Sequence, residues 1–206
     1  MYNTLHAGLT RYLTPEQLKK LRSVRVGIAG AGGLGSNAAL MLARSGVEDM
    51  LLVDDDVVDA SNLNRQQYWP RHVGRPKVEA LAELLRELNP EIQLDIRRLR
   101  LSSSNLPKIA PLCPIWVEAL DDSLSKAMLV EAAILSGARI VAASGLAGYG
   151  GPDMHKRPMG DLTLVGDFVT DVQTAPPLAP RVTQAAAMLA DTVLEFILGP
   201  ATPSQS

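Results

Sequence analysis

The feature that most constrains the fold is a glycine-rich loop close to the N-terminus. Residues 30–35 read Gly-Ala-Gly-Gly-Leu-Gly, which fits the spacing G-x-G-x-x-G. The short run Arg25–Ala29 before the loop reads as a buried strand, and residues 33–45 after it have the alanine and leucine content of a helix. This order of strand, glycine turn and helix is typical of a nucleotide-binding βαβ unit.

The glycines predict a phosphate site, because positions without side chains let the backbone approach a phosphate. The free N–H groups and the dipole at the start of a helix favour its negative charge. The alternative is a tight turn with no ligand. The cofactor-binding positions expected in this loop are Gly30, Gly32, Gly33 and Gly35.

The rest of the chain alternates between strand-like and helix-like segments. Strands are expected at 50–53, 92–99, 115–117 and 139–143, and helices at 76–88, 123–136 and 179–198. The alternation predicts an α/β, doubly wound, mostly parallel sheet of the Rossmann-like kind, with a ligand crevice at the carboxyl ends of its strands. The Gly- and Pro-rich stretch 146–177 is expected to be loops with one strand at 162–165.

One domain is the expected organisation for 206 residues that are 47% hydrophobic. The sequence Thr-Pro-Glu-Gln at 14–17 is a capping box and predicts a short helix over 15–22. Residues 1–24 are therefore expected to form an N-terminal arm and helix, and residues 25–206 the nucleotide-binding domain.

Composition argues against several classes of protein. The formal net charge of −2 argues against a nucleic-acid partner, and no run reaches the roughly 18 apolar residues that a membrane span requires. The single cysteine, Cys113, excludes an internal disulfide and paired zinc knuckles, so no structural zinc is expected. A cytoplasmic location is predicted.

An acidic residue follows the second expected strand. Asp54 is placed to accept hydrogen bonds from both ribose hydroxyls, where it would repel a 2′-phosphate. The glycine loop and this carboxylate suit an ATP enzyme and an NAD enzyme equally well. They predict a nucleotide site without defining the reaction.

Two segments after this strand carry the resemblance to a known family. Residues 54–66 read DDDVVDASNLNRQ, and residues 74–79 read GRPKVE. With AGAGGLG they resemble the ubiquitin-activating-enzyme-like superfamily, particularly the ThiF/MoeB/HesA adenylyltransferases with their D-x-D…S-N-L-x-R-Q and G-x-P-K segments. The likeness extends from about Arg11 to the last helix. Residues 117–121 and 142–150 are most similar to segments of short ThiF-type enzymes.

The resemblance implies ATP-dependent adenylation, with Mg²⁺, of the C-terminal carboxylate of a small ubiquitin-like sulfur-carrier protein. A ThiS-like carrier ending in Gly-Gly, in thiamine thiazole biosynthesis, is the substrate it favours. A molybdopterin-type carrier, an NAD-dependent oxidoreductase and a nucleotide-binding module without catalysis are the alternatives. Cys113 precedes the place where relatives carry a catalytic cysteine, so it is expected to be a small buried hydrophobe.

Adenylation requires an anion to attack a highly charged triphosphate, so the site needs fixed cations. Arg65 and Lys77 are the expected catalytic cations, and Asn62 can donate a neutral hydrogen bond. Lys77 falls in the first turn of an expected helix, where a cation meets the dipole unfavourably, so an anionic ligand explains it better than helix stability does. The alternative is that both cations are ordinary solvated surface charges.

Four further residues complete the expected site. Asp121 follows a strand and matches the family's magnesium ligand, whereas Asp122 has a competing role as a helix N-cap. Asp56 is expected to contact the nucleotide or the metal, or else only to order its loop. Arg11 matches an arginine that serves the partner's site in dimeric relatives, which implies a homodimer. The alternative for Arg11 is an exposed residue without a function.

Overall fold

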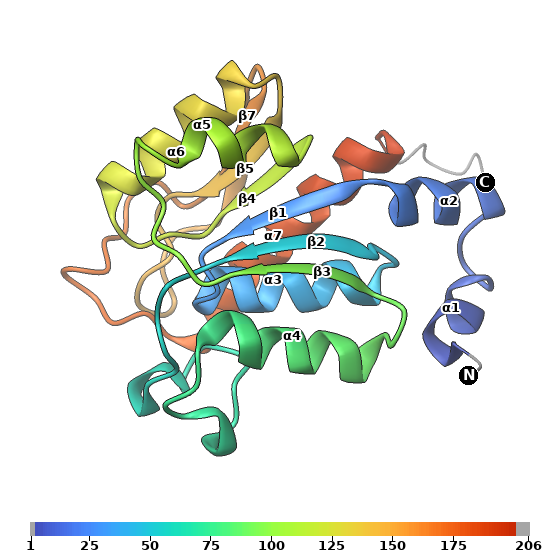
Figure 1. Ribbon diagram of the computed structural model, residues 1–206. Helices are drawn as coiled ribbons and strands as arrows, with labels where there is room; N and C mark the ends of the chain where they lie inside the picture. The colour runs from blue at the N-terminus through green and yellow to red at the C-terminus, as the bar shows by residue number, and fades with distance from the viewer. Residues whose placement is uncertain (1–2, 201–206) are drawn as a thin grey trace.

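A computed structural model describes residues 3–200 and shows one seven-stranded sheet in the order β3-β2-β1-β4-β5-β7-β6 (Figure 1). Its strands are β1 (Arg25–Ala29), β2 (Asp49–Val53), β3 (Gln93–Arg97), β4 (Ile115–Glu118), β5 (Arg139–Ala143), β6 (His155–Met159) and β7 (Leu162–Gly166). The pair β6–β7 is antiparallel and the other five pairs are parallel. The predicted doubly wound, mostly parallel sheet is confirmed.

Helices cover both faces of this sheet. One face carries α3 (Gly33–Arg44), α4 (Lys77–Leu88) and α7 (Ala179–Leu198), and the other carries α5 (Leu106–Ile109) and α6 (Ser123–Leu135) (Figure 1). Each layer has its own apolar cluster, with Leu42 and Leu189 fully buried in the first and Trp116 and Leu129 in the second. The two clusters make the sheet the centre of a three-layer sandwich.

The direction of winding reverses between β1 and β4. The chain runs outward from β1 through β2 to β3 and then returns to β4, which pairs with β1 so that Ala29 lies beside Glu118. The loops that leave β1 and β4 therefore diverge to opposite faces and open a crevice at the carboxyl ends of the strands.

The N-terminal segment contains one predicted helix and one that was not predicted. In α2 (Pro15–Ser23) the capping box is present, since Gln17 N–H donates to Thr14 Oγ1 at 3.2 Å and Thr14 N–H donates to Gln17 Oε1 at 2.9 Å. Leu21 is fully buried, so this helix packs on the core. The preceding α1 (Thr4–Leu9) has six residues and no buried side chain, and so gives no apolar pattern to detect.

Strand β6 and the four-residue helix α5 were also not predicted. All five residues of the β6 sequence, HKRPM, are exposed, and a proline lies within it. A proline is tolerated in an edge strand, and an exposed edge strand shows no alternation of apolar and polar residues. Short 3₁₀ helices are also present at Ala60–Asn62, Pro70–His72 and Ala110–Leu112. Within residues 3–200, no helix combines the length and apolarity needed to cross a membrane.

Candidate active site

A cavity of about 990 Å³ opens at the carboxyl ends of the strands. Six stretches line it: the glycine loop, the loop after β2 together with Lys77, the segments after β3 and β4, and the loops after β5 and β7. Small-molecule sites occupy roughly 300–1,000 Å³, so this cavity is large enough for a nucleotide and part of a second substrate. The crevice predicted at the carboxyl ends of the strands is therefore present.

Protein packing alone requires three of the loop glycines. Gly30 has a φ of +93°, and a Cβ there would lie 2.4 Å from Ala119 O. A Cβ on Gly33 would lie 2.8 Å from Val182 Cγ1 of α7, and one on Gly35 would lie 1.8 Å from Gly30 O. These contacts keep α3 close to the sheet and to α7, so these glycines do not by themselves indicate a ligand.

Gly32 differs from the other three. A Cβ on this residue would meet nothing closer than Gln66 Nε2, at an ordinary contact distance of 3.7 Å, and Gly32 lines the cavity. Gly32 is also the N-cap of α3, so no side chain caps the helix. The first amides of α3 therefore remain available to an anion, and the missing side chain of Gly32 is best explained by close approach of a ligand.

Asp54 connects the glycine loop to the loop after β2. Its Oδ2 accepts Ala31 N–H at 2.6 Å, and its Oδ1 accepts Asp56 N–H at 2.7 Å. Burial raises the pKa of this carboxyl above its usual value, although the hydrogen bonds from Ala31 and Asp56 oppose the rise. Each oxygen retains a second lone pair. Asp54 thus holds the glycine loop and the loop after β2 together, a structural role that the sequence did not indicate. Ribose binding by Asp54 remains a prediction.

Lys77 is buried, so the alternative that it is a solvated surface charge is wrong. Its side chain is 9% exposed, and its Nζ lies 2.7 Å from Asp56 Oδ2, whose own side chain is 62% exposed. Lys77 is the first residue of α4, and the adjacent carboxylate offsets the unfavourable dipole there. Asp56 also accepts Lys77 N–H through its carbonyl at 3.0 Å, so it orders this loop.

Arg65 and Asn62 lie on the same loop and line the cavity. The Arg65 guanidinium is half-buried and donates to Ser61 O at 3.1 Å and to Asn64 Oδ1 at 2.8 Å. Within residues 3–200 it forms no salt bridge. Asn62 Oδ1 accepts Asp59 N–H at 3.1 Å, which leaves the Asn62 amide hydrogens as potential donors. Positive charge and neutral donors therefore face the same cavity as the loop amides.

The segment after β4 supplies the acidic wall. Asp121 is exposed and lines the cavity, as predicted for a metal ligand. Asp122 is the N-cap of α6 and accepts Ser125 N–H at 2.8 Å, and the hydrogen bond from Ser125 lowers the Asp122 pKa. The competing role of Asp122 is therefore confirmed.

Carboxylates suitable for Mg²⁺ are present on two sides of the cavity. Asp121 lies on one side, and Asp54, Asp55 and Asp56 on the other have carboxylate oxygens within 4.8 Å of one another. Mg²⁺ prefers oxygen ligands and commonly uses one or two carboxylates together with substrate phosphates. The residues present fit that ion.

Two buried ion pairs beside the cavity were not predicted. Glu118 is 1% exposed, and its carboxylate accepts a hydrogen bond from Lys126 Nζ at 3.0 Å. Burial raises the pKa of Glu118, although the charge of Lys126 opposes the rise. Arg181 of α7 forms a buried pair with Asp167, in the loop after β7. A charge within an apolar stretch could have suggested that it is paired, but the partners lie 8 and 14 residues away on other elements of the fold, so the sequence does not identify them.

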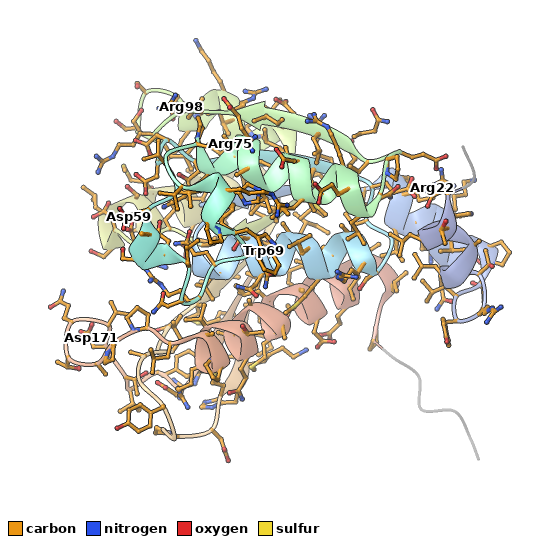
Figure 2. The ribbon with its side chains drawn as sticks, turned by 90° about the horizontal axis from the view of Figure 1, so that it is seen from below. Arg22, Asp59, Trp69, Arg75, Arg98 and Asp171 are labelled. Atoms are coloured by element: carbon orange, nitrogen blue, oxygen red, sulfur yellow. The ribbon has the colours of Figure 1, made fainter. Side chains whose placement is uncertain are left out.

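Two further predictions concern residues outside the cavity. Arg11 is exposed between α1 and α2 and does not line the cavity. In Figure 2, Asp59 and Asp171 of the cavity wall lie at one end of the molecule and Arg22 of α2 at the other. Arg11 therefore lies outside the cavity of its own chain, and a role for it in the site of a partner subunit stays a prediction. Cys113 is 1% exposed, and burial raises its pKa to about 12, which confirms it as a small buried residue.

The fold and the cavity together define an α/β protein of the doubly wound class, with its crevice built around a glycine loop. The family model described as the ThiF family matches residues 5–206, and the chain belongs to that family.

The adenylyltransferase and sulfurtransferase uba4 of Aspergillus terreus is 40% identical over 153 residues, which are 72% of this chain and 31% of that protein. The SAMP-activating enzyme E1 of Haloferax volcanii is 37% identical over 128 residues, which are 62% of this chain and 47% of that one. The chain thus spans less than half the length of these two relatives.

Solved structures with the same fold include two from E. coli. The tRNA N6-threonylcarbamoyladenosine dehydratase TcdA, in complex with ATP, superposes with a TM-score of 0.83 at 21% identity and covers 93% of each chain. MccB with ATP superposes with a TM-score of 0.71 at 24% identity, over 88% of this chain and 58% of that one. At these identities the likeness is one of fold.

Proposed function

We propose that this protein uses ATP to adenylate the C-terminal carboxylate of a small ubiquitin-like carrier protein of the ThiS type, in thiamine thiazole biosynthesis. The observation that carries the proposal is the buried ammonium of Lys77, held by Asp56 in the cavity that contains Gly32 and the uncapped start of α3. Hydride transfer to a dinucleotide has no need of a second phosphate cation at this place.

The reaction forms one bond and breaks one. A carboxylate oxygen of the carrier attacks the α-phosphorus of ATP, the bond from that phosphorus to the β-phosphate bridging oxygen breaks, and pyrophosphate leaves with the bond's electron pair. No proton is transferred in this step. Lys77 and Arg65 hold the negative charge that moves onto pyrophosphate, and the α3 amides fix a phosphate against rotation.

The divalent ion and the ribose are assigned to carboxylates of the same cavity. Asp121, with the acidic group at 54–56, would hold Mg²⁺, which when bound supplies further positive charge to the phosphates. Asp54 is assigned to the ribose hydroxyls and Asn62 to a neutral hydrogen bond with the phosphates. Each of these carboxylates and the amide lines the cavity beside Gly32.

One side of the cavity suits a narrow peptide tail without bulky or charged side chains. On this side the wall includes Ala143 at the end of β5, Ser144, Gly145 and Leu146 after it, and Val182 of α7. A wall of small and apolar residues can accommodate a tail that ends in Gly-Gly, whereas it would not suit a ligand with a charged side chain at this place. The names of two relatives, an adenylyltransferase and an activating enzyme E1, support the same class of reaction.

The test is exchange of labelled pyrophosphate into ATP by the purified protein with Mg²⁺. Exchange is expected only when a carrier ending in Gly-Gly is added, and not with the same carrier lacking its last two residues. A ThiS-type and a molybdopterin-type carrier are compared in parallel, and the larger kcat/KM identifies the substrate. A preference for the molybdopterin-type carrier would replace the ThiS assignment. Tight NAD binding with no ATP binding would replace adenylation by oxidoreduction.

A further inference from the structure

Tyr68 connects the two phosphate-binding parts of the cavity from behind. Its side chain is 5% exposed, and its hydroxyl lies 2.7 Å from Ala31 O in the glycine loop and 3.2 Å from Lys77 O at the start of α4. One hydroxyl therefore contacts the backbone of the loop that carries the amides and the backbone of the residue that carries the cation.

Ala31 is held from two sides as a result. Its N–H donates to Asp54 Oδ2 at 2.6 Å, and its carbonyl accepts the Tyr68 hydroxyl. The peptide groups on both sides of Ala31 are thus fixed and have little freedom to rotate, so the amides that follow at Gly32 and in α3 keep one direction. Burial raises the pKa of Tyr68, and the nearby Asp54 charge raises it further, so the hydroxyl keeps its proton and remains a donor.

The Tyr68 ring is itself immobilised. It packs edge-to-face on His72 with ring centroids 6.1 Å apart and an interplanar angle of 88°. His72 is fully buried, and its Nδ1 accepts Trp69 N–H at 3.1 Å, which places the imidazole proton on Nε2, 3.4 Å from Glu83 Oε1 of α4. The hydroxyl of Tyr68 is therefore anchored to α4 by its ring as well as by its contact with Lys77 O.

We propose that Tyr68 is a positioning residue that sets the distance between the α3 amides and the Lys77 ammonium, and so controls the adenylation rate through Lys77. The proposal rests on the proposed function of the same cavity. Tyr68 does not line the cavity, so it acts without touching either substrate. Removing its hydroxyl leaves the ring packing intact but frees Ala31 O and the start of α4 to move apart.

The test compares Tyr68→Phe with Tyr149→Phe, a change at a tyrosine that is 81% exposed. In pyrophosphate exchange, Tyr68→Phe is expected to lower kcat by about tenfold to a hundredfold, the scale of misplacing a reacting group, with a smaller change in KM for ATP. Tyr149→Phe is expected to match the wild type. Circular dichroism and the unfolding midpoint establish that both variants are folded. A lower midpoint with unchanged kcat would make Tyr68 structural only and overturn the proposal.

A double-mutant cycle with Lys77→Ala tests whether the hydroxyl acts through the lysine. The double variant is expected to be no slower than Lys77→Ala alone, because residues that act through one another are non-additive. Multiplicative losses would overturn the proposal. A wild type that exchanges no pyrophosphate with any carrier would instead contradict adenylation itself. The cycle is then measured on the Kd for Mg²⁺-ATP by calorimetry, with the same two outcomes.

Discussion

The ammonium of Lys77 is buried and lies 2.7 Å from the carboxylate of Asp56, which is largely exposed. The pair keeps a cation inside the cavity while its counter-charge faces water. Water screens an exposed carboxylate, so the attraction between the two charges is modest. An incoming triphosphate can therefore compete for the ammonium, and the cation is already in place when it arrives.

Removing Lys77 or Arg65 from the cavity should abolish most of the activity. Lys77→Ala and Arg65→Ala are each expected to lower the adenylation rate by about 10²-fold or more, because each removes a preorganised charge from the developing pyrophosphate. Pyrophosphate exchange at saturating carrier measures the rate. Lys108→Ala and Arg98→Ala, at exposed positions outside the cavity, serve as matched controls. Near-normal turnover in both site variants would remove these residues from the mechanism.

Two neighbouring glycines should respond in opposite ways to an added methyl group. Gly32→Ala meets no protein atom closer than 3.7 Å, so the free energy of unfolding should change by less than about 1 kcal/mol, while ATP affinity falls because the methyl occupies the phosphate approach. Gly33→Ala places its Cβ 2.8 Å from Val182 Cγ1 and should cost about 1–3 kcal/mol. Urea unfolding and calorimetry measure the two quantities. Unchanged ATP binding by Gly32→Ala would exclude phosphate binding at that position.

The buried Asp167–Arg181 pair should make stability depend on pH in acid. Burial alone would raise the Asp167 pKa, but hydrogen bonds from Thr170, Val169 and Arg181 lower it to about 2, against an ordinary value of 3.8. Because the folded pKa is the lower one, the ionised carboxylate stabilises the fold fully above pH 3.8 and progressively less as the pH falls toward 2.

Asp167→Asn is accordingly expected to cost about 3–5 kcal/mol near neutral pH, since it leaves Arg181 buried without its partner. The difference from the wild type should be constant above pH 5 and shrink as the pH falls below 3.8. Urea unfolding at several pH values measures it, and Asp161→Asn, an exposed position, is the control. A difference that grows as the pH falls would contradict the assignment.

Arg11 should act on the site of a second copy of the chain if the working enzyme is the expected homodimer. Arg11→Ala and Lys77→Ala dimers should each be nearly inactive. Random exchange of subunits should restore roughly a quarter of wild-type activity, because half of the dimers are mixed and each has one complete site. A mixture that remains inactive after verified exchange would mean that Arg11 has no role in catalysis.

Periodicity and turn residues made most of the sheet predictable. The strands Arg25–Ala29 and Arg139–Ala143 and the helix Ala179–Leu198 have the expected bounds, because buried strands and long apolar helices leave strong local patterns. Strand β6 could not be predicted in this way. Its exposed residues carry no pattern, and its conformation depends on pairing with β7.

The residues of the candidate site that belong to sequence motifs could be predicted. Those whose position depends on contacts with other segments of the chain could not. Gly32, Arg65, Lys77 and Asp121 all line one cavity, as expected from the glycine loop, the two motifs after the second strand and the strand that precedes Asp121. The burial of Lys77 and the pairing of Asp167 with Arg181 depend on contacts between segments that are separate along the chain. A pattern read along one segment contains no information about such partners.

The contact between Gly33 and Val182 joins the start of the first crossover helix to the last helix of the fold. Because α7 packs along α3, the N-terminal end of α3, which is proposed to bind phosphate, gains this support only once the chain has been synthesised through α7. During translation the glycine loop thus emerges long before the surface that holds it. ATP affinity would then report whether the C-terminal helix has docked, and a nascent chain that ends before residue 179 would be a poor nucleotide binder however complete its motifs are.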